Sequence, residues 1–212
     1  MAERPRKGSI HVALVALLLA GAPAGAQPTA WDELERARAE LARGAIEAEF
    51  AQTYVPAGFS TGDEESGRIY LSLPDCLRWD YEEPYPRRYL LCGQTAWAWT
   101  PDEPVGDRYL EVSREEAGLD FLLLSVERLR ARYEARLGEP STDRVVIDLA
   151  ALDAEAPFET ARIVLDGESG RPVRIEYADR EGNRTRFDLS AFEALDASDR
   201  FAPPEDVRWI DG

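Results

Sequence analysis

The sequence has almost none of the side chains that most enzymes use for proton transfer, nucleophilic attack or metal binding. Its 212 residues include a single His, His11, and a single Lys, Lys7. Both lie in the first 26 residues, so the rest of the chain has no His for a Ser-His-Asp triad, a Cys-His pair or a His-ligated metal. It also has no Lys for Schiff-base or P-loop chemistry. We therefore expect no enzyme activity, no metal and no cofactor.

Residues 1–26 have the three parts of a secretory signal peptide. Arg4, Arg6 and Lys7 form the charged start, Ile10 to Ala20 the apolar core, and Ala24-Gly25-Ala26 the cleavage site. A membrane anchor is the alternative, but the apolar core is too short to cross a bilayer. No Cys follows the cleavage site, so the sequence has no lipid-attachment signal. We expect an exported, periplasmic protein with a single domain over residues 27–212.

Acidic residues dominate what remains after cleavage. Removing three basic residues and Glu3 leaves 22 Arg against 40 Asp and Glu, a net charge of −18. Such a surface excludes nucleic acid as a partner, because phosphate binding needs basic residues. It indicates a self-repelling surface, which fits a monomer, or attraction to basic partners. Paired carboxylates also serve glycosidases, but no motif here sets an acid against a base.

Residues 74–101 predict a β-hairpin followed by a third strand. Aromatic residues alternate at period two, and Glu82 to Pro86 carries two prolines that end regular pairing. A hairpin symmetric about Pro84 places Leu77 opposite Leu91 and Trp79 opposite Tyr89 on one apolar face. The other face has the pairs Asp80 with Arg88 and Cys76 with Cys92. A tight turn at 92–94 then leads into the strand Thr95 to Trp99, whose Trp97 and Trp99 we expect on the apolar face.

Cys76 and Cys92 are the only cysteines of the chain. An oxidising compartment permits a disulfide, and the symmetric register sets the two residues directly opposite. Such a bridge would stabilise by about 3 kcal/mol in the chain-entropy model. Two buried thiols are one alternative, and a redox pair is another, although the C-x-x-C spacing is absent. We expect a structural disulfide.

The rest of the chain predicts one helix and a meander of antiparallel strands. Apolar spacing indicates a helix over 30–43, and 58–67 is predicted as a polar turn. On the last strand Thr185, Phe187 and Leu189 oppose Arg184, Arg186 and Asp188. Tight, polar turns separate strands in the C-terminal third. The predicted strands are 46–54, 68–73, 107–113, 144–149, 160–165, 172–178 and 183–189.

Leu119 to Leu124 form a dense apolar run, followed by Val126, Leu129 and Tyr133 at helical spacing. One interpretation is an ordinary core helix that continues through Tyr133. The other is an amphipathic lid over an open sheet face.

Several of these segments resemble the LolA family of periplasmic outer-membrane lipoprotein carriers. The segment most similar to a motif of this family is Cys92-Gly93-Gln94-Thr95-Ala96-Trp97-Ala98-Trp99-Thr100-Pro101. Shorter pieces are Phe50-Ala51-Gln52, Leu71-Ser72-Leu73-Pro74, Arg78-Trp79-Asp80-Tyr81 and Phe201 to Val207. The resemblance implies a mainly β fold, with an antiparallel sheet curved into a half-open, incomplete barrel and helices covering its concave face. It also favours the lid interpretation.

The same resemblance implies a soluble chaperone that carries lipoproteins by their acyl chains from the inner to the outer membrane. Its partners would be an inner-membrane ABC transporter similar to LolCDE and an outer-membrane acceptor. Leu73 departs from the family pattern, because the best-studied branch has an Arg before this Pro that hydrogen-bonds to the lid. The alternative is a lipid-binding or sensing module similar to RseB or LolB, which carries another lipid or regulates envelope stress.

The ligand-binding residues that this hypothesis predicts are apolar and aromatic. On pattern alone, the filled core of a closed barrel is the favoured interpretation of the tryptophans; only the family resemblance favours a cavity wall. Ile46, Ile175 and Phe187 are expected on the same inner face. The predicted cavity residues are Phe50, Ile69, Leu71, Leu73, Leu77, Trp79, Tyr89, Leu91, Trp97, Trp99, Phe121 and Leu122.

Overall fold

The structure, a computed structural model, describes residues 27–112, 125–139, 141–196 and 198–212. Within these ranges the helices are Ala30–Leu41 (α1) and Val126–Arg132 (α3), with a short 3-10 helix at Ser198–Phe201 (η1). The strands of the first half are Ile46–Val55 (β1), Asp63–Ser72 (β2), Cys76–Glu83 (β3), Arg87–Cys92 (β4), Thr95–Trp99 (β5) and Val105–Tyr109 (β6). Those of the second half are Tyr133–Leu137 (β7), Arg144–Ala151 (β8), Thr160–Asp166 (β9), Pro172–Ala178 (β10), Arg184–Ala194 (β11) and Arg208–Asp211 (β12).

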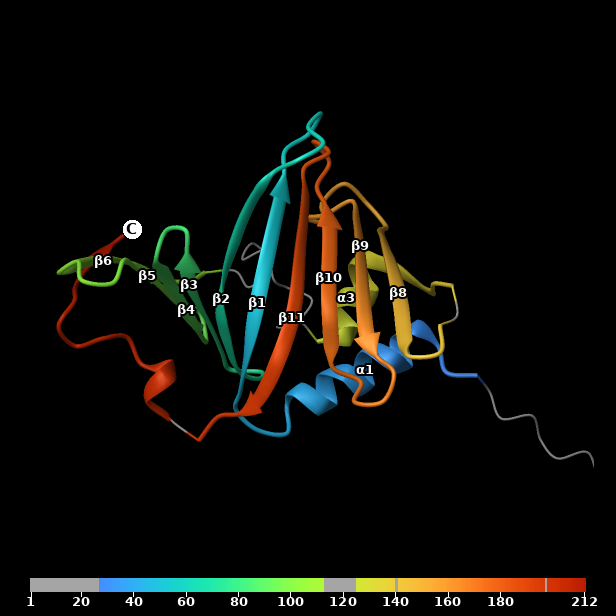
Figure 1. The fold of residues 1–212 in the computed structure, drawn as a ribbon, viewed down its shortest axis with the longest axis horizontal. Helices are drawn as coiled ribbons and strands as arrows, with labels where there is room; N and C mark the ends of the chain where they lie inside the picture. The colour runs from blue at the N-terminus through green and yellow to red at the C-terminus, as the bar shows by residue number, and fades with distance from the viewer. Residues whose placement is uncertain (1–26, 113–124, 140, 197) are drawn as a thin grey trace, which may run out of the picture.

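All twelve described strands form one open sheet. Their order is β12-β6-β5-β4-β3-β2-β1-β11-β10-β9-β8-β7, so β12 and β7 are the edges and the sheet does not close (Figure 1). Neighbouring strands are antiparallel, except that β12 runs parallel to β6. The two halves of the chain meet at the centre of the sheet, where β1 pairs with β11, and at one end, where β12 pairs with β6. The prediction of a mainly β, half-open antiparallel sheet is confirmed, with this one parallel pair as an addition.

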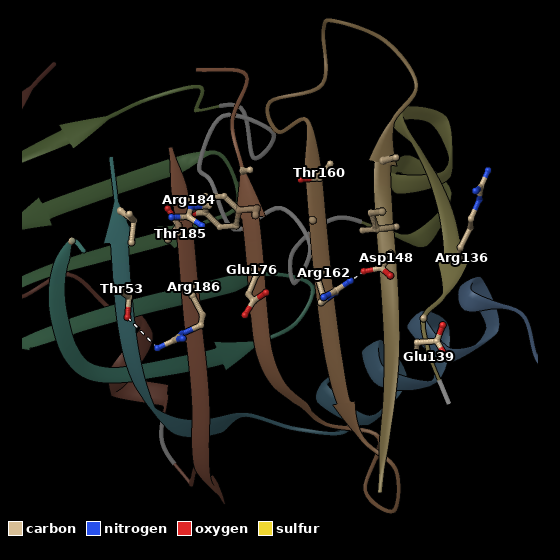
Figure 2. Close-up of a pocket in the computed structure, with 18 of the residues that line it drawn as sticks. Thr53, Arg136, Glu139, Asp148, Thr160, Arg162, Glu176, Arg184, Thr185 and Arg186 are labelled. Atoms are coloured by element: carbon tan, nitrogen blue, oxygen red, sulfur yellow. Dashed lines mark hydrogen bonds and ion pairs between the residues drawn. The ribbon is translucent and has the colours of Figure 1, made fainter. Parts of the chain in front are cut away.

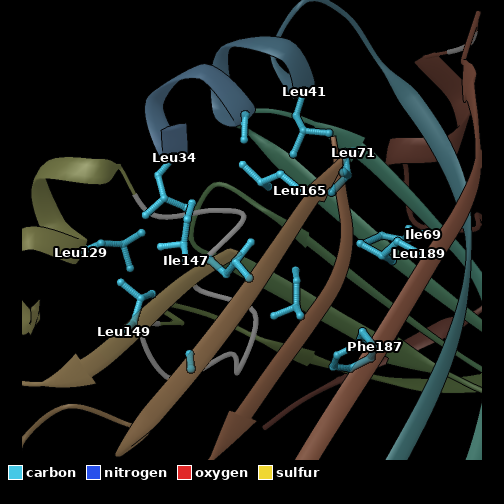
Figure 3. Packing of buried hydrophobic residues seen from close by; sticks show 14 of the residues in the cluster. Leu34, Leu41, Ile69, Leu71, Leu129, Ile147, Leu149, Leu165, Phe187 and Leu189 are labelled. Atoms are coloured by element: carbon cyan, nitrogen blue, oxygen red, sulfur yellow. The ribbon is translucent and has the colours of Figure 1, made fainter. Parts of the chain in front are cut away.

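The helices cover one face of the sheet, which we call the inner face. In Figure 1 α1 and α3 lie behind β8, β9 and β10. Thr29 and Asp32 form a capping box that starts α1. Leu34, Leu41 and, from α3, Leu129 then pack against strand residues such as Ile147 and Leu165 (Figure 3). Burial of this apolar stripe holds the helices on the sheet.

Strand alternation separates the two faces as the sequence predicts. On β11 Thr185, Phe187 and Leu189 are buried, and the residues between them are more exposed. On β1 Ile46, Ala48 and Phe50 belong to the core with the helices. The same strands therefore have one face toward the core and one toward solvent.

The register of the β3–β4 hairpin is the predicted one. Leu77 pairs with Leu91 and Trp79 with Tyr89, and Cys76 pairs with Cys92. The disulfide between these two cysteines is present. It closes a loop with a sequence separation of 16 residues.

The expected position of Trp97 and Trp99 is wrong. The β4–β5 turn has two residues, Gly93 and Gln94, and Gly93 adopts φ 61°, a conformation that glycine accepts without strain. This turn pairs Leu91 with Ala96, so the alanines follow the inner face. Trp97 and Trp99 pair with Leu90 and Arg88 and lie on the outer face.

Several further boundaries differ from the predictions. Helix α1 ends at Leu41 and not at residue 43, β8 continues to Ala151, and β11 continues to Ala194 beyond the predicted end at residue 189. Asp63 to Ser66, predicted as a turn, extend β2 because they pair with Ala51 to Tyr54 of β1. The predicted helix through Tyr133 stops at Arg132, because Tyr133 starts β7 and pairs with Ala151 of β8. Strand β6 ends at Tyr109, and Leu119 to Leu124 lie outside the described residues. Strands β7 and β12 were not predicted.

Candidate functional site

The inner face has a continuous cluster of seven aromatic side chains, which we call the aromatic cluster. Phe50 lies at its centre, with ring centroids 4.7 Å from Trp79, 5.0 Å from Tyr81 and 6.1 Å from Phe187. The cluster continues on one side to Tyr89 and on the other, through Tyr177, to Phe158. Edge-to-face contacts at these separations are favourable for aromatic rings. The result is a contiguous apolar surface that extends over strands from both halves of the sheet.

A glycine in β2 allows the centre of this cluster to form. Gly67 lies opposite Phe50 of β1 on one side and Tyr81 of β3 on the other. Because Gly67 has no side chain, Phe50 contacts the rings of β3 directly across β2. An added Cβ at Gly67 would lie 2.0 Å from the Asp80 carbonyl oxygen. Any larger residue would therefore force β2 and β3 apart.

Aliphatic residues occupy the inner face on the side of the cluster toward α1. Ile46, Leu71, Leu77 and Leu91 form one row, because each pairs with the next across β1, β2, β3 and β4. All four are buried, and Leu73 packs at their edge. The row belongs to the same core as Leu41 of α1.

Polar groups border the aromatic cluster on the other side. Tyr81 Oη donates to Gln52 Oε1 at 2.6 Å. Arg87 makes two hydrogen bonds to the Glu65 carboxylate, at 2.6 and 2.8 Å, and its guanidinium lies 3.9 Å from the centre of the Tyr81 ring. We call Gln52, Glu65, Tyr81 and Arg87 the polar collar. The inner face thus changes from aliphatic to aromatic to polar along its strands.

Charge in the polar collar is balanced. The hydrogen bonds to Glu65 raise the pKa of the Arg87 guanidinium above its ordinary value, so Arg87 stays charged. Burial raises the pKa of Tyr81, which keeps the phenol neutral. The collar therefore offers neutral hydrogen-bonding groups and a compensated ion pair.

Trp79, within the aromatic cluster, has an unsatisfied donor. Its side chain is buried, with 6% of its surface exposed. Among the buried side-chain nitrogen and oxygen atoms of the described residues, only the Nε1 of Trp79 has no hydrogen-bond partner. Leaving such a donor unpaired costs about 1–3 kcal/mol.

Most predicted cavity residues come together on the inner face. Phe50, Ile69, Leu71, Leu77, Trp79 and Leu91 are all buried there, and Tyr89 pairs with Trp79 at the rim of the cluster. Ile46, Ile175 and Phe187 also lie on this face. Phe121 and Leu122 lie outside the described residues. Whether the others contact a ligand is taken up as a proposal below.

Several residues of the site are absent from the set predicted from the sequence. Tyr81 alternates with Trp79 and could have been placed by that period alone. Tyr177 shares a face with Ile175 in the same way. No local pattern in the sequence marked Gln52, Glu65 and Arg87, because their contacts depend on pairing among β1, β2, β3 and β4.

Trp99, although on the outer face, has a structural role there. Its ring centroid lies 5.9 Å from that of Trp209 in β12, at an interplanar angle of 90°. The Arg78 guanidinium lies 5.3 Å from the Trp99 ring, forms an ion pair with Asp80 and donates to the Arg200 carbonyl oxygen. We call Arg78, Asp80, Trp99 and Trp209 the outer clasp, because they hold the C-terminal segment on the sheet.

Among the hollows against the described residues, two stand out: the larger has mainly polar side chains in its lining, and the smaller combines Arg78, Arg88 and Glu205 with Trp99 and residues 202–204. The larger, about 1320 Å³, is lined mainly by outer-face residues of β1 and β7–β11, with Leu149, Ala161, Tyr177 and Thr185 from the inner face (Figure 2). The smaller, about 350 Å³, adjoins Arg78, Arg88 and Trp99 of the outer face. Neither is lined by Phe50 or Trp79.

Charges alternate across the outer face beside the larger hollow. Each residue of one row pairs with the next across neighbouring strands: Arg136, Asp148, Arg162, Glu176 and Arg186, which we call the outer charge row. Arg162 donates to Asp148 at 2.6 Å. A row of compensated charges is a poor surface for an apolar ligand. The inner face is therefore the better candidate site, although the larger hollow is elsewhere.

Known proteins are similar to this chain in sequence and in fold. The family described as outer membrane lipoprotein carrier protein LolA matches residues 43–202. The chain belongs to the LolA family. An outer-membrane lipoprotein carrier protein of Alkalilimnicola ehrlichii is 28% identical over 184 residues, 82% of this chain and 83% of the relative. One from Xanthomonas campestris is 26% identical over 152 residues, 70% of this chain and 71% of the relative.

Solved structures share the fold of this LolA-family chain. An uncharacterized conserved protein from Thermus thermophilus has a TM-score of 0.56 at 12% identity, covering 86% of this chain and 99% of that one. MucB in the Pseudomonas aeruginosa MucA/MucB complex has a TM-score of 0.52 at 16% identity, covering 85% of this chain and 63% of that one. Among the described residues, no helix is long and apolar enough to cross a membrane.

Proposed function

We propose that this protein is a periplasmic carrier that binds the acyl chains of lipoproteins on its inner face and moves them from the inner to the outer membrane. The observation that supports this most directly is the aromatic cluster on an open sheet, continuous with a row of aliphatic residues. Membership of the LolA family and the names of its relatives support it further.

Acyl chains fit this surface energetically. Burial of each CH₂ group contributes about 0.8 kcal/mol, so a lipoprotein with several chains needs a container to cross an aqueous compartment. The described ligand side chains would be Phe50, Ile69, Leu71, Leu77, Trp79, Tyr89 and Leu91, with Leu73 at the edge. Transfer needs no covalent step, in keeping with a chain that has no His or Lys after residue 26.

Export is part of the proposal. Residues 1–26 would be removed as a signal peptide, and the Cys76–Cys92 disulfide suits an oxidising compartment. Loading would come from an inner-membrane ABC transporter similar to LolCDE, and delivery would go to an outer-membrane acceptor.

Leu73 bears on how the site would close. Its side chain packs against the core and has no hydrogen-bond donor. Closure over the inner face would therefore use apolar contacts at this position, in place of the hydrogen bond that an Arg makes in the best-studied branch of the family. Such contacts compete directly with an apolar ligand, which provides a route to release.

The first test is to identify what the protein carries. The full chain would be expressed for export, purified from the periplasm without detergent, and measured by native mass spectrometry. We expect a stoichiometric acylated protein. A clean mass with no uptake of a fluorescent acyl probe would contradict the proposal. A bound partner without acyl groups would favour a regulatory module instead, since MucB, crystallised with MucA, shares this fold.

A matched pair of tyrosines locates the site. Tyr89 is 41% exposed on the inner face, and Tyr85 is 74% exposed at the tip of the same hairpin. Tyr89→Glu places a charge beside the aromatic cluster and should weaken binding of the acyl probe about tenfold or more, because a carboxylate resists desolvation. Tyr85→Glu should leave binding within twofold. Equal effects would move the site away from the inner face.

A further inference from the structure

The indole N–H of Trp79 is a hydrogen-bond donor without an acceptor, and it lies within an apolar surface. Its Nε1 has no partner among the described residues, and the side chain is 94% buried. Buried indoles usually find a partner for this group. A Phe would supply the same aromatic contacts here without burying a polar atom.

The neighbours of Trp79 explain why the protein itself does not satisfy this donor. The closest rings are Phe50, at a centroid distance of 4.7 Å, and Phe187, at 5.2 Å, and neither has an acceptor atom. Tyr81, at 6.3 Å, directs its hydroxyl to Gln52. Among the described residues, the indole N–H of Trp79 therefore has no acceptor.

We propose that Trp79 Nε1–H donates a hydrogen bond to the carbonyl oxygen of the ester or amide that joins an acyl chain to the rest of the ligand. This inference rests on the proposed carrier function and specifies which part of the ligand the site recognises. Trp79 is then a specificity-determining residue within an otherwise non-directional apolar surface.

Charge selects a neutral carbonyl over a carboxylate or a phosphate. The cation that contacts this cluster, Arg87, is already bound to Glu65 through two hydrogen bonds. A free fatty acid would bring a buried negative charge to a site whose cation is compensated, which is unfavourable. An ester or amide carbonyl needs one neutral donor, and Trp79 supplies it.

The position of Trp79 in β3 suits a linkage group. Leu77, Trp79 and Tyr81 point to the same face, and alternate residues of a strand are about 7 Å apart. A carbonyl held at Trp79 leaves the hydrocarbon over Leu77 and its aliphatic row. The polar part of the ligand then passes the polar collar at Tyr81.

The test removes the donor without changing the shape of the side chain. The native chain is compared with a chain carrying benzothienylalanine at position 79, in which sulfur replaces the indole N–H, and with Trp79→Phe. Each is titrated by displacement of a fluorescent acyl probe with two ligands of equal chain length. One is a monoacylglycerol ester, and the other is the alkyl glycerol ether that lacks the carbonyl.

We expect the native chain to bind the ester about five to ten times more tightly than the ether, the size of one net hydrogen bond. Both variants should bind the two ligands equally, with affinity for the ether changed less than twofold in the benzothienylalanine chain. Trp97 on the outer face is the matched control: benzothienylalanine there should leave the ester preference intact. The native chain should also prefer the ester over the free fatty acid at pH 7.

Three results would overturn the inference. They are equal binding of ester and ether by the native chain, an ester preference that survives the loss of the N–H at position 79, and tighter binding of the free fatty acid. In each of these cases acyl chains still bind, so the carrier proposal stands. Failure of every ligand to displace the probe from the native chain would overturn both proposals together.

Discussion

The two faces of one sheet use the same strands in different ways. On β11 the inner Phe187 joins the aromatic cluster, and its neighbour Arg186 belongs to the outer charge row. Inner-face residues contact others from both halves of the chain and from the helices. Outer-face residues of β7–β11 mostly contact their immediate strand neighbours. In β7–β11, packing and the proposed binding are therefore concentrated on the inner face, and the outer face contributes mainly exposed ion pairs between neighbouring residues.

The largest expected difference in stability between the two faces is at two adjacent residues of β11. Phe187→Ala should reduce the free energy of unfolding by about 3–5 kcal/mol, because it leaves a cavity among Phe50, Trp79 and Tyr177. Arg186→Ala should reduce it by less than about 1 kcal/mol, as expected for an exposed ion pair. Urea unfolding followed by tryptophan fluorescence measures both. Similar losses would show that the two faces contribute alike.

Substitutions in the outer clasp should reduce stability as much as substitutions in the core. Arg78 and Asp80 are both more than nine-tenths buried. Arg78→Ala should therefore cost about 3–5 kcal/mol, because it leaves Asp80 buried without its main partner. The double variant Arg78→Met with Asp80→Leu should lose less than the single one. A double variant at least as unstable as Arg78→Ala would contradict this account.

The disulfide is the next largest contribution of the outer face. Replacing Cys76 and Cys92 by Ser should lower the free energy of unfolding by about 3 kcal/mol, since a loop with a separation of 16 residues loses its constraint in the unfolded chain. Thermal unfolding with and without a reductant gives the comparison. The double Ser variant should be insensitive to the reductant, whereas the native chain should lose stability.

The outer charge row should matter little and depend on salt. Asp148 and Arg162 form an exposed pair, and Arg162→Ala should cost at most about 1 kcal/mol. Raising the ionic strength from about 0.01 M to about 1 M should shrink that difference, because screening shortens the reach of exposed charges. Stability measured by urea at both salt concentrations checks it. A loss that persists in high salt would point to packing as its source.

The smallest expected effect is at the start of α1. Hydrogen bonds from the Thr29 backbone and hydroxyl lower the pKa of Asp32 below its ordinary value of 3.8. A carboxylate with a lowered folded-state pKa stabilises the protein above its unfolded pKa, and this contribution is lost as the pH falls through the folded pKa. The native chain should therefore lose more stability than Asp32→Asn between about pH 5 and about pH 2. Parallel pH profiles would contradict this.

The register of the first hairpin was predictable because two independent signals agree. Two prolines fix the turn, and the alternation of Leu77, Trp79 and Tyr81 fixes which face is apolar. The position of Phe187 was also predictable. Its neighbours on both sides are charged, so only one orientation of the strand buries an apolar face. The fold class followed from many such strands with short turns.

Trp97 and Trp99 show where local pattern fails. A two-residue turn sets the parity of β5, and a shift of one residue moves every side chain to the opposite face. The small Ala96 and Ala98 fit the inner face, and Trp99 finds its partner in Trp209, more than a hundred residues later. The alternation of residues within one strand cannot predict a contact between residues so far apart in the sequence. The polar collar was missed for the same reason, because it depends on pairing among β1, β2, β3 and β4.

The pairing of β1 with β11 also determines when the sheet can form during synthesis. Ile46 pairs with Ala194, which lies 148 residues later in the chain. Contacts of such high sequence separation make folding slow, because closing a long loop precedes any gain from the contact. A chain emerging from the ribosome therefore has β1 to β6 long before the strand that completes the centre of the sheet. The centre of the sheet therefore stays incomplete until β11 has been synthesised.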